Sequence, residues 1–385
     1  MLHSLTPAQI AIRDKAAGAA KHIAKTIDAI DKQTGHSKEW WDALHAMEHA
    51  GLLRLYIPKE QGGEGCDLLS LVLAQEEMGK VDGGFSNIIS HEACAYVIFT
   101  NLPDKKLRDH CLKRMSEGAL TCIAITEPDT GTDLAGMKTE AKRDGDSWVI
   151  SGHKRVASLA AAAGMYLVFA ITDRSKGTRG ISAFLVDQGT PGLSVGEVDE
   201  LMGYRQLPPA DVHLKDVRIQ ASQLLGEEGN GINIFAQALN LGRLGGGTQA
   251  LGVAQGAFEL ALEHAKTRKT FGKPLIEHQA IQFSLSEMAI QIEASRAMIY
   301  QVARWMQEHG DLSSRETGTY CAMVKSQASD MAMKVTIDAV QIFGSYGNYR
   351  SRGVERLMRD AKVTQLVDGP NEVMKMRIGH TLRRG

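Results

Sequence analysis

The spacing of apolar residues changes twice along this chain, and those changes limit its architecture more than any other feature. From Thr6 to Met115 apolar residues recur every three or four positions, which is typical of amphipathic helices. From about Leu120 to Leu224 short β-rich runs alternate with Asp-Gly, Lys-Gly and Pro-Gly turns. Beyond Leu224 only two prolines occur and helical spacing returns, so long helices are expected as far as Leu382.

This order predicts an α+β protein with three domains. We expect an N-terminal helical domain at 1–119, a middle antiparallel β domain at 120–224 and a C-terminal helical bundle at 225–385. Thr6 and Pro7 form a cap and first-turn pair, which predicts one helix as far as Lys32. Ser37 is expected to cap a second helix over 39–50.

Charge and cysteine usage exclude several classes of protein. The 385 residues carry 44 basic and 45 acidic side chains, and the only basic cluster is Arg383 and Arg384, so a nucleic-acid partner is not expected. No window approaches the roughly 18 apolar residues of a membrane span, and the first residues lack the pattern of a secretion signal. Five scattered cysteines without a CxxC pair favour a reducing compartment, so we expect a cytoplasmic protein without a membrane partner.

Common nucleotide and metal motifs are absent from the sequence. The glycines of 242–247 lack the GxGxxG spacing and lie within a helical pattern, which argues against a Rossmann fingerprint. No P-loop occurs, and His91-Glu92 lacks the second histidine of HExxH, so no metal site is expected.

Four stretches, in order along the chain, carry a resemblance to a known family. They are IAITEPDTGTD at 123–133, RKTFG with EHQ at 268–272 and 277–279, QIFG with VERLMRDA at 341–344 and 354–361, and Asp368-Gly369. Together they resemble the signatures of the acyl-CoA dehydrogenase flavoproteins. The resemblance implies the family's α, β, α fold, an FAD held between subunits of a homotetramer, an acyl-CoA substrate, and an electron-transfer flavoprotein as electron acceptor.

The same resemblance implies roles for individual residues. Those expected to contact the flavin or the rest of FAD are Ile125, Thr126, Ser158, Arg268, Phe271, His278, Gln279, Gln341, Gly344 and Glu372. Those expected near the substrate are Thr132, Arg243 and Gly369. Hydroxyl donors suit a flavin ring that gains negative charge, and the planar fork of arginine suits a pyrophosphate.

The sequence departs from the family pattern at two functional positions. Asp368 stands where many members carry a glutamate base, and Gly242 stands where a smaller group carries it, so Asp368 is the expected base, with Glu372 as its rival. Val156 replaces the aromatic ring that commonly packs on the flavin.

These departures leave two alternatives to an acyl-CoA dehydrogenase. One is an enzyme similar to the nitroalkane oxidases, which would use Asp368 on a small carbon acid and reoxidise with dioxygen. The other is a redox-silent relative, either a lyase or a structural subunit. Dependence on acyl-CoA distinguishes the first alternative, and turnover without an electron acceptor would identify a lyase.

Overall fold

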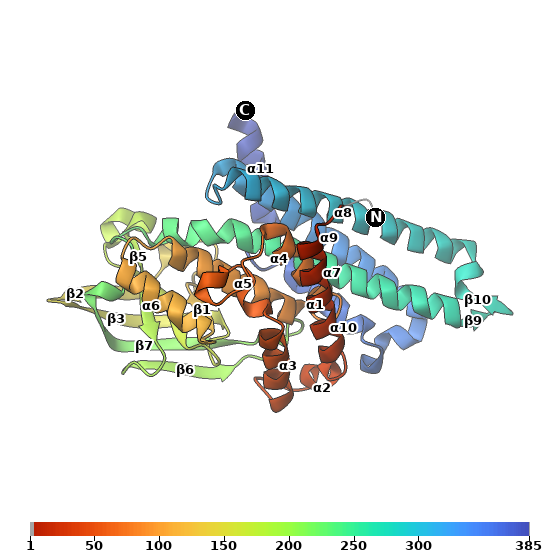
Figure 1. Ribbon diagram of the computed structural model, residues 1–385, viewed down its shortest axis with the longest axis horizontal. Helices are drawn as coiled ribbons and strands as arrows, with labels where there is room; N and C mark the ends of the chain where they lie inside the picture. Colours follow the sequence, from red (N-terminus) through yellow and green to blue (C-terminus); the bar gives the residue numbers. More distant parts are fainter. Residues whose placement is uncertain (1–3, 385) are drawn as a thin grey trace.

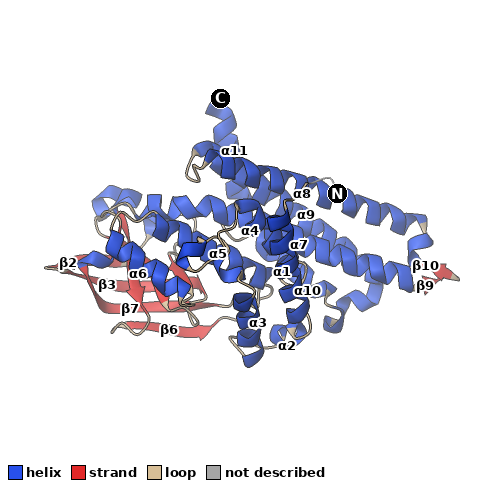
Figure 2. Ribbon diagram, viewed as in Figure 1, coloured by secondary structure: helices blue, strands red, loops and turns tan. Residues whose placement is uncertain are grey.

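The computed structural model describes residues 4–384, apart from the side chains of Gln237 and Arg384. A β sheet occupies one end of the molecule, helices fill the middle, and a small β9–β10 hairpin lies at the opposite end (Figures 1 and 2). This arrangement confirms the predicted succession of helical, β and helical parts. None of the described helices combines the length and apolar composition required to cross a bilayer.

The N-terminal part is helical, with one correction to the sequence prediction. Its helices are α1 (Pro7–Ile23), α2 (Ile27–Asp31), α3 (Lys38–His49), α4 (Leu68–Gly79), α5 (Gly83–Thr100) and α6 (Lys105–Ser116). Thr6 caps α1 with a reciprocal capping box and Pro7 is its first residue, as predicted. The single helix expected as far as Lys32 was wrong, because the chain leaves the helical pattern at residues 24–26, where the Thr26 hydroxyl donates to the Ile23 carbonyl at 3.3 Å.

The middle part is an eight-stranded sheet with the order β6-β7-β3-β2-β4-β5-β8, and β1 pairs with β4. The strands are β1 (Thr121–Ala124), β2 (Glu140–Asp144), β3 (Ser147–Ser158), β4 (Met165–Ile171), β5 (Ile181–Asp187), β6 (Leu193–Val198), β7 (Pro209–Gln220) and β8 (Leu224–Leu225). Most pairs are antiparallel, as predicted, but β1 runs parallel to β4. All seven residues of β4 are buried, so this strand is the core of the sheet.

Long helices form the C-terminal part, as predicted. They are α7 (Gly231–Thr267), α8 (Gln279–His309), α9 (Arg315–Phe343), α10 (Val354–Thr364) and α11 (Asn371–Arg384), and the short strands β9 (Lys269–Thr270) and β10 (Lys273–Pro274) connect α7 to α8. Helix α7 packs against α9, α5 and α4 and therefore joins the two helical parts. The glycines at 242–247 lie inside this helix.

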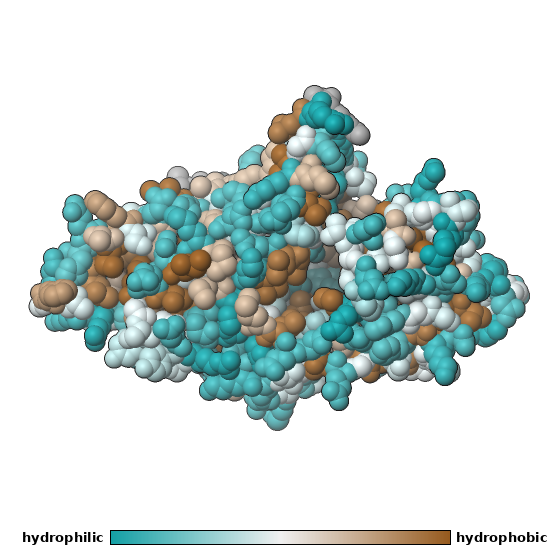
Figure 3. Space-filling view, turned by 180° about the vertical axis from the view of Figure 1, so that it is seen from behind, coloured by the Kyte–Doolittle hydropathy of each residue, from teal (hydrophilic) through white to brown (hydrophobic). Residues whose placement is uncertain are grey.

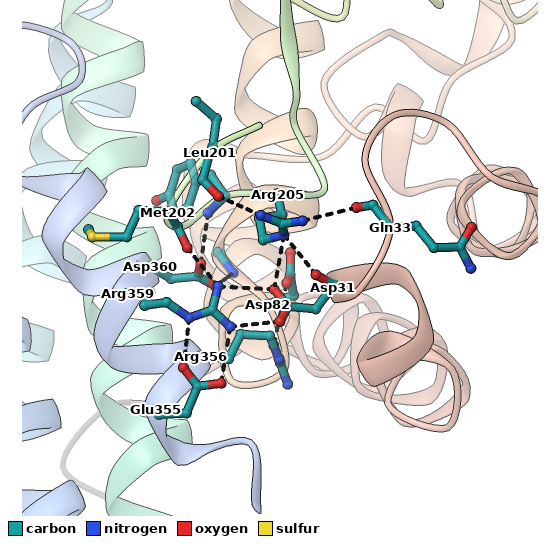
Figure 4. Close-up of polar contacts among 12 residues, drawn as sticks. Asp31, Gln33, Asp82, Leu201, Met202, Arg205, Glu355, Arg356, Arg359 and Asp360 are labelled. Carbon is teal, nitrogen blue, oxygen red and sulfur yellow. Dashed lines mark hydrogen bonds and ion pairs between the residues drawn. The ribbon is translucent and has the colours of Figure 1, made fainter. Parts of the chain in front are cut away.

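Buried charges fix α10 against the rest of the molecule (Figure 4). Asp360 accepts hydrogen bonds from the backbone N–H groups of Tyr204 at 2.8 Å and Gly83 at 3.1 Å. The adjacent Arg359 reaches both carboxylate oxygens of Asp31, at 3.1 and 2.7 Å. Helix α10 is thus bonded to α2, to the start of α5 and to the loop before β7, and the loop that follows α10 starts from a fixed position.

Candidate active site

Asp368 lies in the loop between α10 and α11, in an uncommon backbone conformation. Its φ is +56° and that of the following Gly369 is +93°, so two successive residues adopt positive φ. Aspartate is among the non-glycine residues that tolerate the left-handed region best, although the conformation still costs roughly 1–2 kcal/mol. Such strain persists only where neighbouring contacts hold it, and it is common at functional sites.

The Asp368 carboxylate faces a bare stretch of α7. A methyl group added at Gly242 would lie 3.5 Å from its Oδ1, and one added at Gly246 would lie 3.4 Å from its Oδ2. These glycines are one helical turn apart, so they present one face of α7 to the carboxylate. The Cys94 thiol of α5 lies 3.7 Å from the same point at Gly242. The structure therefore brings together the two positions at which the resemblance predicts a base, and of the two only Asp368 has a carboxylate.

Two buried cations surround this carboxylate. Burial raises the pKa of Asp368, and the charges of Lys325 and Arg243 act in the opposite direction. Arg243 is only 7% exposed, bonds to Asn240 Oδ1 at 3.0 Å, and has a pKa that burial lowers to about 10. The predicted substrate-side residues Arg243 and Gly369 are thus both close to Asp368.

A second cluster forms where β1 leads into the β domain. The backbone N–H of Arg155 donates to the Thr126 carbonyl at 2.8 Å, and Lys154 Nζ donates to the Ile125 carbonyl at 3.3 Å, which places both residues beside the end of β3. Ser158 is the last residue of β3. Between these positions Val156 has φ +56° and is 58% exposed, an outlier for a β-branched side chain.

This second cluster has the chemistry needed to hold a flavin. Within residues 4–384 neither the Thr126 nor the Ser158 hydroxyl has a hydrogen-bond partner, and both residues are half-buried. Open hydroxyl donors beside an exposed strand edge suit a flat ring that gains negative charge. Thr132, the third predicted hydroxyl, is exposed on the loop after β1.

An ion pair that sequence reasoning missed organises that loop. Glu127 and Lys154 are both buried and lie 2.8 Å apart. Glu127 also accepts from the backbone N–H groups of Lys138 at 2.6 Å and Thr139 at 2.9 Å, which closes the loop of 127–139. Burial works against ionisation of Glu127, but the charge of Lys154 and these hydrogen bonds lower its pKa. The available signal was a glutamate within the matched stretch of 123–133 and a lysine two residues before Val156.

The remaining predicted cofactor residues lie at the other end of α7. They are Arg268, Phe271, His278, Gln279, Gln341 and Gly344, around the β9–β10 hairpin and the end of α9 (Figure 1). Arg268 is exposed and lies over the Tyr346 ring at 5.7 Å. Phe271 is 97% exposed with φ +49°. An exposed guanidinium beside an exposed aromatic ring suits the pyrophosphate and adenine portion of a dinucleotide.

Glu372 does not lie with that group in a single chain. It is exposed in the first turn of α11, four residues after Asp368. Its charge acts on Lys325, the buried lysine beside Asp368. Lys325 was also missed from the sequence, although a lysine among the small residues of the buried face of α9, such as Ala322 and Ala328, was a signal.

Comparisons with known proteins show which family this chain resembles over almost its whole length. Three family models match in order: acyl-CoA dehydrogenase, N-terminal domain, at residues 6–119; middle domain at 122–217; and C-terminal domain at 229–382. A short-chain specific acyl-CoA dehydrogenase of Megasphaera elsdenii is 38% identical over 371 residues, covering 94% of each chain.

Solved structures give the same result. Butyryl-CoA dehydrogenase from Megasphaera elsdenii matches with a TM-score of 0.94 and 36% identity over 100% of both chains. A chain from a study of the electron transferring flavoprotein of Acidaminococcus fermentans also has a TM-score of 0.94, with 36% identity over 100% of both chains.

Proposed function

This chain belongs to the acyl-CoA dehydrogenase family, and we propose that it is an FAD-dependent enzyme that removes hydrogen from the α and β carbons of a short acyl-CoA thioester. Members of the family use a flavin. We propose FAD because one cluster of residues suits the flavin ring and a second, separate cluster suits the pyrophosphate and adenine. We also propose domain boundaries at 119/120 and 224/225, close to the ends of α6 and β8.

In this proposal Asp368 is the base. Its carboxylate accepts the α-proton while the α C–H bond breaks, and the bare face of α7 at Gly242 and Gly246 leaves room beside it for the thioester. A bound flavin would supply the acceptor for the hydride that leaves the β-carbon. Thr126 and Ser158 would donate hydrogen bonds to the flavin, and Ile125 and Val156 would lie beside it. Arg243 and Gly369 border the substrate near Asp368, and Thr132 lies at the rim.

The cofactor is shared between subunits in this proposal. Gly246 and Arg268 are 22 positions apart on α7 and its end, which corresponds to about 33 Å along the helix axis. In a single chain the Asp368 cluster and the Arg268 cluster are therefore too far apart to contact the same cofactor molecule. A second copy would supply the Arg268 cluster, with His278, Gln279, Gln341 and Gly344 on the adenine and pyrophosphate side, whereas Glu372 would come from the chain that supplies Asp368.

Exposed apolar side chains support association with further copies. Phe283 and Ile290 of α8, Ile337 of α9 and Met376 of α11 are each between 49% and 66% exposed. Figure 3 shows hydrophobic side chains on the projecting C-terminal helix and across the middle of that face. Contiguous exposed apolar surface is typical of protein interfaces, and we propose a homotetramer.

We propose an electron-transfer flavoprotein as the electron acceptor and the cytoplasm as the location. The first rests on the 0.94 TM-score match to the chain from the electron transferring flavoprotein study. The second rests on five cysteines that all remain free, four of them buried.

The observation that carries the proposal is the Asp368 carboxylate against the bare face of α7. We expect purified protein to be yellow, with FAD close to one per chain. The Asp368→Asn protein should retain FAD, but butyryl-CoA should reduce its flavin about 100 to 10,000-fold more slowly, because positioned bases contribute about that factor. The measurement is anaerobic stopped-flow absorbance of the flavin.

Glu372→Gln is the control, since it should change FAD affinity and leave the chemical step intact. Full activity in Asp368→Asn would overturn the assignment and direct attention to His91 and Glu92 on α5. Rapid reoxidation by dioxygen with nitroalkanes, or turnover without an electron acceptor, would favour the alternatives.

A further inference from the structure

Lys325 of α9 is a buried cation without a carboxylate partner in direct contact. Its side chain is 0% exposed, and its Nζ donates to the carbonyls of Gln365 at 3.1 Å and Gly369 at 2.8 Å and to Asn371 Oδ1 at 2.9 Å. All three acceptors are neutral, and among the residues that the structure describes no ion pair involves Lys325. Burial of an ammonium group is expensive, so a lysine retained here without an ion pair requires an explanation.

The three acceptors enclose the turn that carries Asp368. Gln365 precedes it, whereas Gly369 and Asn371 follow it, so one ammonium group joins both ends of the turn. This is the turn in which Asp368 and Gly369 both have positive φ. Asn371 is itself held in place, because its side-chain amide donates to Ser329 Oγ at 2.9 Å. Lys325 therefore supplies the contacts that hold the strained conformation in place.

The stem of Lys325 also lies near the Asp368 carboxylate. A methyl group added at Gly246 would lie 3.4 Å from Asp368 Oδ2 and 3.7 Å from Cγ of Lys325, so the lysine stem and the carboxylate meet the same point of α7. Burial lowers the pKa of Lys325 to about 8, opposed by Asp368, Asp330 and Glu372 and assisted by Arg243. The other ionisable groups whose pKa responds to Asp368 are Cys94, Tyr204 and Arg243.

We propose that Lys325 is a positioning residue for the base: its ammonium group holds the Gln365–Asn371 turn so that the Asp368 carboxylate faces Gly242 and Gly246, and its charge favours the ionised form of that carboxylate. This inference rests on the proposed role of Asp368. It assigns Lys325 no contact with the substrate. A charge enclosed by neutral acceptors stays available to act on Asp368, whereas a direct ion pair with another carboxylate would neutralise it.

The test compares Lys325→Met, Lys325→Arg and the control Lys334→Met in the FAD-loaded enzyme. Lys334 is on the same helix but its side chain is 52% exposed. Flavin reduction by butyryl-CoA is followed by anaerobic stopped flow between pH 5.5 and 9.5, together with FAD content and the thermal midpoint. The rate rises with pH as the base ionises, so the acid limb of the profile reports the pKa of the base.

For Lys325→Met we expect the limiting rate to fall about 10 to 100-fold, as for a base displaced by up to about 1 Å. The acid limb should move to higher pH, because the carboxylate has lost the cation whose charge lowers its pKa most, while FAD content and the dissociation constant of butyryl-CoA stay unchanged. Lys325→Arg keeps the charge but not the three-acceptor geometry, so its rate should fall with the acid limb in place. Lys334→Met should match the parent enzyme.

The outcomes separate the possible failures. An unmoved acid limb in Lys325→Met, with losses only in thermal midpoint or FAD content, would make Lys325 a structural residue and overturn the inference. If Lys325→Met does not fold, the rate of flavin reduction in Lys325→Arg tests the proposal. A rate equal to that of the parent enzyme would show that Lys325 does not position Asp368. Asp368→Asn is measured in parallel: full activity there means that the base assignment has failed, whereas an inactive Asp368→Asn with an unmoved Lys325→Met profile rejects the role of Lys325 alone.

Discussion

The glycines of α7 have different neighbours, although the sequence presents them as one cluster. At Gly245 an added methyl group would lie 2.7 Å from Cβ of Ser90, and at Gly247 it would lie 2.6 Å from a methyl group of Val324. These two glycines allow helices to pack closely. Gly242 and Gly246 instead face Asp368 at ordinary contact distance, so their lack of a side chain leaves room beside the proposed base.

This difference predicts opposite effects of the same substitution at adjacent residues. Gly246→Ala should keep or raise the thermal midpoint, since alanine is favoured over glycine in a helix by about 1 kcal/mol. It should slow flavin reduction by isobutyryl-CoA more than by butyryl-CoA, because the added methyl group occupies the face next to Asp368. Gly245→Ala, the matched control, should lower the midpoint, since overpacking costs about 1–3 kcal/mol. An equal loss of stability in both variants would make both glycines packing residues.

At the residue scale the sequence predicted some site residues and missed others for a physical reason. Asp368, Arg243 and Gly369 were predicted, and they lie together in the structure. Lys325 was missed because its acceptors are two backbone carbonyls and one amide about 40 positions along the chain, and such contacts leave no pattern of residue types. A buried ion pair is easier to predict from the sequence than a lysine with neutral acceptors, because it requires two residues of opposite charge.

Among the elements, α5 and β1 meet through one buried carboxyl group. Glu92 of α5 is 3% exposed, and its Oε1 accepts from both the backbone N–H and the hydroxyl of Thr121 at 3.0 Å. The preceding His91 contacts the Thr121 carbonyl through Nε2 at 3.1 Å. Burial raises the pKa of Glu92 to about 8 and lowers that of His91 to about 4. This junction joins the Asp368 cluster to the strand that leads to Thr126.

The Glu92 pKa predicts a pH dependence of stability that Glu92→Gln should remove. Between about pH 4.5 and 8 the folded protein keeps this proton and the unfolded chain has lost it, so its contribution to stability falls as pH rises, by roughly 1.4 kcal/mol per pH unit. Glutamine keeps the acceptor for Thr121 and does not titrate. The thermal midpoint of the variant relative to the parent should therefore increase from pH 5.5 to 8.

His91 does not disturb this comparison. Its lowered pKa favours the folded protein as pH rises from about 4 to 6.5, and this contribution is present in both proteins. A difference in thermal midpoint between Glu92→Gln and the parent that stays constant with pH would show that Glu92 is ionised when folded.

The elements themselves were largely predictable, and the exceptions depend on contacts distant in sequence. The long helices and their caps follow from local spacing and from residues such as Thr6 and Ser37. The break between α1 and α2 is hidden, because Ile23, Ile27 and Ile30 continue the helical spacing across it and are all buried. The parallel pairing of β1 with β4 depends on where the chain leaves the N-terminal helices. The alternation of residue types within a strand carries no information about that position.

Over the whole molecule, the two clusters that we propose to bind the cofactor are separated by the length of α7. The sheet with Thr126 and Ser158 lies at one end, and the hairpin with Arg268 and Phe271 lies at the other (Figure 1). An almost fully exposed phenylalanine with positive φ, on a hairpin that contacts little else, is costly unless another surface covers it. A second copy that covers the hairpin would complete each site with residues from both chains.

Shared sites predict that two inactive variants restore activity when combined. Arg268→Glu should abolish binding of FAD, because it places negative charge beside the pyrophosphate, and Asp368→Asn should remove the base. In a hybrid dimer, the site built from Asp368 of the first variant chain and Arg268 of the second is intact, and the other site carries both changes. Random pairing makes about one quarter of all sites intact in a two-fold dimer.

The experiment co-expresses the two chains with different tags, isolates the hybrids and measures butyryl-CoA-dependent flavin reduction. Each variant expressed alone should be inactive, and so should a mixture of the separately purified proteins under conditions without subunit exchange. If each chain instead supplied both clusters of its own site, a hybrid would contain no intact site, and co-expression would restore nothing. Activity near one half of the parent enzyme in the isolated hybrids, or near one quarter before they are separated, therefore follows from an Arg268 cluster that serves the neighbouring chain.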